Sequence, residues 1–133
     1  MRKIDHIGIA VDDIEASNKL FAKIFGKENF KSESVESESV ITSFFQVGES
    51  KIELVAATNQ NSPIAKYLDK NKEGMHHIAF DVQDIKAEMK RLQSEGIRTL
   101  NDQPKQGADN KLICFLHPKD TNGVLIELCQ EIG

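Results

Sequence analysis

The sequence lacks the features that mark membrane, secreted and nucleic-acid-binding proteins. No apolar run approaches the roughly 18 residues that a membrane-spanning helix needs, and the N-terminus has no apolar signal-peptide segment. A formal net charge of −4 leaves no basic excess that would attract nucleic acid. We therefore expect a cytoplasmic protein with neither a membrane nor a nucleic-acid partner.

Cysteine is also scarce. Cys114 and Cys129 are the only two cysteines in the 133 residues, and they do not form a CxxC motif. Each lies in an apolar run typical of a strand, so we expect buried free thiols. Apolar residues make up 39% of the chain and charged residues 29%, which is ordinary for a globular protein. The length suits one compact domain, or two small ones that share a core.

What the sequence does contain is an internal repeat. Residues 5–16 recur as residues 76–87, and without gaps six of the twelve columns are identical: His6/His77, Ile7/Ile78, Val11/Val82, Asp13/Asp84, Ile14/Ile85 and Ala16/Ala87. A second pair of segments, 51–54 and 125–128, follows in the same order. Each half therefore has one histidine near its start and one glutamate near its end.

Hydrophobic periodicity and breaker residues predict the same order of elements in both halves. In the first half we expect a helix from Asp12 or Asp13 to Gly26 and strands at 3–11, 28–37 (weakly), 39–47 and 51–56. In the second half we expect a helix from Asp84 to Gly96 and strands at 75–82, 97–100, 111–117 and 124–130. A short helix over 64–70, with Pro63 at its first position, connects the halves.

Each half is thus a β-α-β-β-β module. A module of this size cannot bury a sheet face alone, so two copies are expected to pack together. The prediction is an α+β protein with a single domain over residues 1–133. Within it, module 1 covers about 1–57, a linker helix about 62–72, and module 2 about 73–133.

The repeated histidines and glutamates are candidate metal ligands. Strand alternation puts His6 on one face with Gly8 and Ala10, and His77 with Ala79, so small neighbours leave space in front of both rings. A carboxylate on an apolar strand is costly to bury unless it is paired or bound to a metal. A core histidine and a lysine-paired glutamate are the alternatives. The duplication favours a metal site, because an approximate two-fold axis would bring all four side chains together.

The chain resembles the vicinal oxygen chelate superfamily, which includes glyoxalase I and the extradiol dioxygenases. The histidine and glutamate positions carry that resemblance. Within the superfamily the chain is most similar to the methylmalonyl-CoA epimerase family, in residues 5–11, 62–68, 74–80, and 115–119 with 123–128. The Ser-Pro-Ile-Ala-Lys stretch at 62–66 and the His-Pro-Lys stretch at 117–119 are the more specific signals.

This resemblance implies sheets that curve around a metal-centred cavity with one divalent ion per chain, either Co, Ni, Mn or Zn. The ligands implied are His6, Glu53, His77 and Glu127. Some epimerases have Gln at the position of Glu53, which makes that ligand the less certain one to transfer. The family's second acid/base, a glutamate on the second or third strand, has no clear counterpart, and the nearest positions are Ile41 and Thr42.

The activity implied is epimerisation of (R)- and (S)-methylmalonyl-CoA, by removal and return of the proton at C2 through an enolate. Glu127 is the candidate catalytic acid/base, with Glu53 as a second. Lys119 and Lys66 are candidates for binding the CoA phosphates, although they could also be ordinary solvated lysines. Strand edges left by the modules make a homodimer plausible.

Three other functions use the same architecture. Glyoxalase I isomerises the methylglyoxal–glutathione hemithioacetal with the same types of ligand. An extradiol dioxygenase fits less well, because its facial triad has a single carboxylate. A non-catalytic, resistance-type binding protein would lack the complete ligand set.

Overall fold

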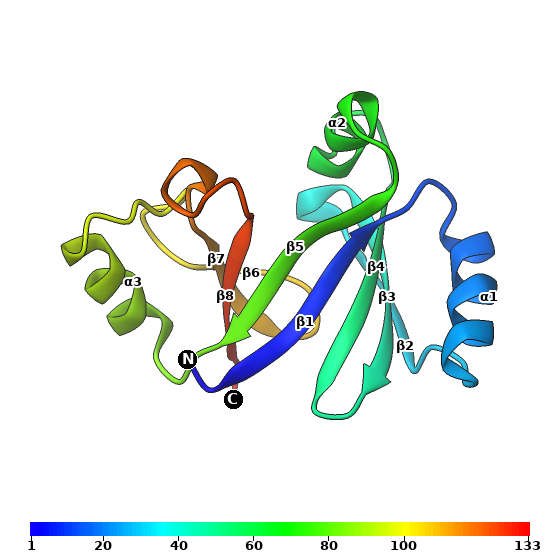
Figure 1. The fold of residues 1–133 in the computed structure, drawn as a ribbon, viewed down its shortest axis with the longest axis horizontal. Helices are drawn as coiled ribbons and strands as arrows, with labels where there is room; N and C mark the ends of the chain where they lie inside the picture. The colour runs from blue at the N-terminus through cyan, green and yellow to red at the C-terminus, as the bar shows by residue number, and fades with distance from the viewer. The chain divides into compact units, whose positions relative to one another are not determined.

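The computed structural model describes residues 1–133 and contains two compact units. Unit 1 comprises Met1–His6 and His77–Gly133, and unit 2 comprises Ile7–His76. The strands β1 (Lys3–Ala10) and β5 (Gly74–Asp81) each contribute residues to both units. The element order confirms the predicted α+β class with two β-α-β-β-β modules (Figure 1). None of the helices is both long and apolar enough to cross a membrane.

Unit 2 contains four adjacent strands in the order β2-β3-β4-β1, and β2, β3 and β4 pair antiparallel. Besides the end of β1, its elements are α1 (Ile14–Phe25), β2 (Lys31–Val35), a 3-10 turn (Glu36–Glu38), β3 (Val40–Val47), β4 (Ser50–Ala57) and α2 (Pro63–Lys70). These bounds confirm the predicted elements of the first half to within a few residues.

The ends of α1 follow from local chemistry. The carboxylate of Asp13 accepts hydrogen bonds from the backbone N–H groups of Glu15 and Ala16, at 3.0 and 3.1 Å, which satisfies two donors of the first turn. Gly26 ends the helix in the left-handed conformation, with φ of 72°, where a side chain would be strained. Asp13, rather than Asp12, is therefore the capping residue.

The two faces of the unit 2 sheet are covered by different helices. Helix α1 contacts β3 and β4, as Figure 1 shows, over a buried cluster of Val11, Phe45, Leu54 and Ala56. On the opposite face α2 contributes Ile64 to a cluster with Ala10, Val40 and Val55. Because side chains alternate along β4, Glu53 lies on the same face as Val55.

Unit 1 contains the start of β1 followed by β5, β8, β7 and β6 in that order. β5 and β8 are parallel, whereas β8–β7 and β7–β6 are antiparallel. The elements are α3 (Ile85–Ser94), β6 (Lys105–Gln106), β7 (Lys111–Phe115), a 3-10 turn (Pro118–Asp120) and β8 (Ile126–Glu131). Helix α3 contacts β7 and β8 over the buried residues Val82, Ile85, Met89, Leu92, Cys114, Leu116 and Leu128 (Figure 1).

The predicted strand at 97–100 is wrong. Only Thr99 forms a bridge, to Leu116, and no ladder develops. The reason is that the backbone N–H of Arg98 donates to the carboxylate of Asp120 at 2.8 Å, so it is not available to a neighbouring strand. The Arg98 guanidinium binds the same carboxylate through Nε and Nη2, so the ladder stops at the two backbone hydrogen bonds that flank Thr99.

A short strand appears instead in the predicted loop. β6, Lys105–Gln106, forms a hairpin with β7, and the turn between them contains Asp109 and Asn110 with positive φ values of 60° and 53°. Asp and Asn tolerate this conformation better than most residues. The β-α-β-β-β order of the second module is therefore kept, with its second strand a few residues later than predicted.

Candidate functional site

Three of the four predicted metal ligands converge in unit 1. His6 lies on β1, His77 on β5 and Glu127 on β8. The Nε2 atoms of the two histidines are 3.1 Å apart. Nε2 of His77 lies 3.3 Å from Oε1 of Glu127, and Nε2 of His6 lies 3.8 Å from Oε2 of the same carboxylate. The structure thus aims two imidazole nitrogens and one carboxylate at a common point.

The strand register explains this convergence. On β8, Glu127 lies opposite Ala79 of β5 and Phe115 of β7. Ala79 is fully buried and small, which leaves room beside the carboxylate. The ring of Phe115 meets His77 edge to face, with centroids 5.7 Å apart, and the two histidine rings are also perpendicular at 5.2 Å. The imidazoles are therefore oriented by packing as well as by their polar partners.

The three side chains fit a divalent transition metal ion. Imidazole nitrogen and carboxylate oxygen bind such ions at about 2.0–2.2 Å, which separates neighbouring donor atoms by about 3–3.5 Å. The observed separations of 3.1, 3.3 and 3.8 Å are close to this range. An N,N,O donor set is compatible with Zn, Co, Ni and Mn alike, so the donors do not select one metal.

The site is buried and its carboxylate is charged. His6, His77 and Glu127 are only 6%, 8% and 5% exposed. Burial by itself would raise the pKa of Glu127, but hydrogen bonding and charge from His6, together with the charge of His77, outweigh it and hold the pKa below its ordinary value. Glu127 is therefore available as an anionic ligand or as a base.

Glu53, the fourth predicted ligand, lies in unit 2. It is 6% exposed and sits on β4 opposite Phe44 of β3. Thr42, one of the two positions nearest to the missing second acid/base, is also buried, and its hydroxyl donates to the backbone oxygen of Glu33 at 3.2 Å.

The lysines proposed to bind CoA are both exposed. Lys119 lies in the 3-10 turn Pro118–Asp120, where its backbone N–H donates to Nδ1 of His117 at 3.2 Å. Lys66 lies on α2 in unit 2. The His117 contact gives the His-Pro-Lys stretch a defined turn, so the backbone that carries Lys119 is fixed while its side chain faces solvent.

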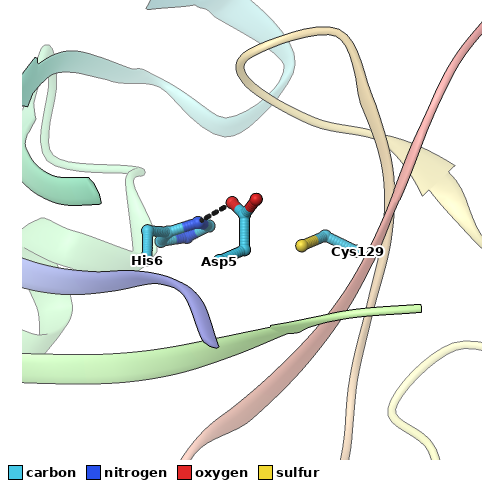
Figure 2. Close-up of side chains that lie close together, drawn as sticks. All are labelled: Asp5, His6 and Cys129. Atoms are coloured by element: carbon cyan, nitrogen blue, oxygen red, sulfur yellow. Dashed lines mark hydrogen bonds and ion pairs between the residues drawn. The ribbon is translucent and has the colours of Figure 1, made fainter. Parts of the chain in front are cut away.

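Sequence reasoning missed a second group of buried polar residues beside His6. The carboxylate of Asp5 lies between the His6 ring and the thiol of Cys129, as Figure 2 shows, and Lys111 approaches the same carboxylate at 3.4 Å. The repeat could not reveal Asp5, because the equivalent position in the second half is His76. The one available signal was the Asp-His pair itself.

Asp5, His6 and Cys129 lie close enough together to be considered as metal ligands themselves, but their chemistry opposes it. Burial, together with the charges of Asp5 and Glu127, raises the pKa of the Cys129 thiol far above its ordinary value. The thiol lies 3.5 Å from the backbone oxygen of Phe80, in position to donate its proton there. Because the thiolate is the metal-binding form, a protonated thiol beside a lysine is a poor ligand.

The prediction of buried free thiols is confirmed for Cys114 and Cys129. Burial raises the pKa of Cys114 as well. We expect neither thiol of the native protein to react with Ellman's reagent at pH 8 over minutes, and both to react at once in guanidinium chloride. Rapid reaction of Cys129 in the native protein would contradict its assignment as a protonated, structural side chain.

Comparison with known proteins identifies the family. The family model described as Glyoxalase/Bleomycin resistance protein/Dioxygenase superfamily matches residues 5–115. The chain is 40% identical over 130 residues to the ethylmalonyl-CoA/methylmalonyl-CoA epimerase of Cereibacter sphaeroides, covering 96% of this chain and 97% of that protein. The chain belongs to the methylmalonyl-CoA epimerase family. This places it among the epimerases, a class of isomerase.

Two further members of the family support the assignment. The mitochondrial methylmalonyl-CoA epimerase of Homo sapiens is 39% identical over 129 residues, which cover 96% of this chain and 73% of the human protein. A variant of the Streptomyces coelicolor methylmalonyl-CoA epimerase, solved in complex with 2-nitronate-propionyl-CoA, superposes with a TM-score of 0.95 at 37% identity. That match covers all of this chain and 96% of the other. The resemblance stated from the sequence is thus confirmed.

Proposed function

We propose that this chain interconverts (R)- and (S)-methylmalonyl-CoA with the help of one divalent metal ion. The observation that carries the proposal is the convergence of His6, His77 and Glu127 in a member of the epimerase family. Glu53 is proposed as the fourth ligand, on the basis of its burial and its place in the repeat. One chain is proposed to hold one ion.

The chemistry of the substrate explains why such a site is suitable. The proton at C2 lies between a thioester and a carboxylate, and its removal leaves an enolate. A divalent ion would act as a Lewis acid toward the oxygens of these two groups. A buried site strengthens electrostatic interactions and keeps water away from the reacting carbon. The low exposure of the three ligands provides such surroundings.

The proton movements are assigned to the two glutamates. Glu127, held ionised beside the histidines, takes the C2 proton on one face of the substrate or returns it. Epimerisation requires delivery of a proton on the opposite face, and we assign that step to Glu53. Its support is the symmetry of the repeat, in which Lys51–Leu54 matches Leu125–Leu128.

Recognition of the CoA portion is proposed to involve Lys119 and Lys66. Both are exposed, and cationic side chains are suitable partners for the CoA phosphates. Lys119 has the stronger support, since its backbone is fixed by His117. A homodimer in the cytoplasm remains our proposal for the assembly and its location.

A deuterium-exchange assay tests the proposal. The protein, loaded in turn with Co, Ni, Mn or Zn, is incubated with (R)- or (S)-methylmalonyl-CoA in heavy water, with methylglyoxal and glutathione in a parallel reaction. We expect exchange at C2 together with interconversion of the epimers, and loss of both on chelation. Isomerisation of the hemithioacetal alone would instead make the chain a glyoxalase. Inactivity toward both substrates would favour a binding protein.

A further inference from the structure

The hydrogen bond between Asp5 and His6 fixes the chemistry of one proposed ligand. Oδ2 of Asp5 lies 2.8 Å from Nδ1 of His6, and the two side chains are shown joined in Figure 2. Asp5 is only 2% exposed. With the Lys111 ammonium against its other oxygen, the carboxylate accepts this hydrogen bond, so the proton of the bond belongs to Nδ1. With Nδ1 protonated, Nε2 is the nitrogen of His6 that a metal ion at this site would bind.

Lys111 anchors the Asp5 carboxylate on the side away from His6. Its ammonium lies 3.4 Å from Oδ1 of Asp5, although the residue is 106 positions away in the sequence. Lys111 is itself only 4% exposed. Burial would lower the pKa of Lys111, but the charges around it, with Asp5 the largest, raise it above its ordinary value. Glu131, on the solvent side, lies 3.4 Å from the same ammonium.

This arrangement makes the two halves unequal. The position equivalent to Asp5 in the second half is His76, whose ring packs edge to face on Tyr67 with centroids 4.9 Å apart. The imidazole of His77 instead packs on Phe115. The repeat therefore supplies two histidines of the same type, but a buried aspartate–lysine pair is present only beside His6.

We propose that Asp5, anchored by Lys111, is a positioning residue that holds His6 with its proton on Nδ1 and its Nε2 directed at the proposed metal position. The inference rests on the proposed metal site. Partners of this kind orient a metal-binding imidazole and make it a better ligand, and their loss commonly lowers metal affinity by about 10–100-fold. Asp5 itself is not expected to touch either the ion or the substrate.

The first test needs no metal. In metal-free protein labelled with ¹⁵N-histidine, the nitrogen shifts and two-bond couplings report which ring nitrogen carries the proton. We expect His6, assigned by comparison with His6→Gln, to be protonated on Nδ1 in the wild type. The tautomer with its proton on Nε2 would overturn the proposal. This result does not depend on whether the protein is an epimerase.

The second test measures metal affinity. We expect Asp5→Asn to lower the affinity for Co²⁺, measured by titration calorimetry, by about 10–100-fold, since an amide can also donate a hydrogen bond to Nδ1. Epimerase activity should fall at limiting Co²⁺ and recover at saturating Co²⁺. Lys111→Met should also lower the affinity for Co²⁺. Unchanged affinity in Lys111→Met would overturn the anchoring role of Lys111.

Asp81 provides the matched control. It is also 2% exposed, and it is paired with a cation, the Arg2 guanidinium, at 2.7 Å. Asp81→Asn should therefore lower the melting temperature without changing the His6 tautomer or the Co²⁺ affinity of the folded protein. An equal loss of affinity in Asp81→Asn would show that destabilisation alone explains the effect. A wild-type protein that binds Co²⁺ without epimerase activity would instead count only against the proposed function.

Discussion

Replacing Glu127 by Gln is expected to lower kcat for epimerisation, and the rate of C2 deuterium exchange with it, by about 10²–10⁴-fold, the usual contribution of a general acid/base. Gln retains the shape of the side chain and one carbonyl oxygen, but it cannot take up the proton. The environment of Glu127 favours the ionised form that this role requires, because its pKa lies below the ordinary value. Chiral separation of the two epimers and NMR detection of deuterium at C2 measure the two rates.

Two comparisons separate a catalytic loss from a structural one. Glu33→Gln, at a half-buried position on strand β2, is a matched substitution and should leave both rates unchanged. The metal content of Glu127→Gln, measured by mass spectrometry after loading, shows how much of the loss comes from the ion. Exchange and turnover at the wild-type rate in fully loaded Glu127→Gln would eliminate Glu127 as the base.

Replacing His77 by Ala is expected to lower the affinity for a divalent ion by more than about 100-fold. This loss exceeds the one expected when a residue that only supports a metal ligand is replaced. The imidazole contributes a nitrogen that lies within 3.1 Å of His6 and 3.3 Å of Glu127. Its removal leaves one nitrogen and one carboxylate at the centre of unit 1. Calorimetric titration with Co²⁺ or Zn²⁺ measures the affinity, and epimerase activity should be lost at limiting metal.

The neighbouring His76 is the control for this experiment. It precedes His77 on β5 but has the opposite strand parity, and its ring packs on Tyr67. His76→Ala should therefore retain the wild-type metal affinity while losing an aromatic contact. Equal loss of affinity in the two variants would mean that the histidines act through the stability of β5 rather than as ligands.

Local chemistry in the sequence was sufficient to predict most of the elements. Asp13 and Asp84 cap their helices, Gly26 ends the first one, and Pro63 occupies the first turn of α2, each for reasons confined to a few neighbouring residues. The strand predicted at 97–100 does not form a ladder, because the backbone N–H of Arg98 donates to the side chain of Asp120, about 20 residues away. Hydrophobic periodicity carries no information about a distant side chain that binds a backbone N–H group in place of a neighbouring strand.

For the site, the sequence determined which residues to consider, and the tertiary structure decided how they meet. The duplicated pattern singled out His6, His77 and Glu127, because a repeat shows equivalent positions even when their contacts are unknown. Their separations, and the burial that keeps Glu127 charged beside two imidazoles, depend on strand register and on Ala79 and Phe115. The Asp5–Lys111 pair depends wholly on folding, since residues 106 positions apart meet only when the sheet forms.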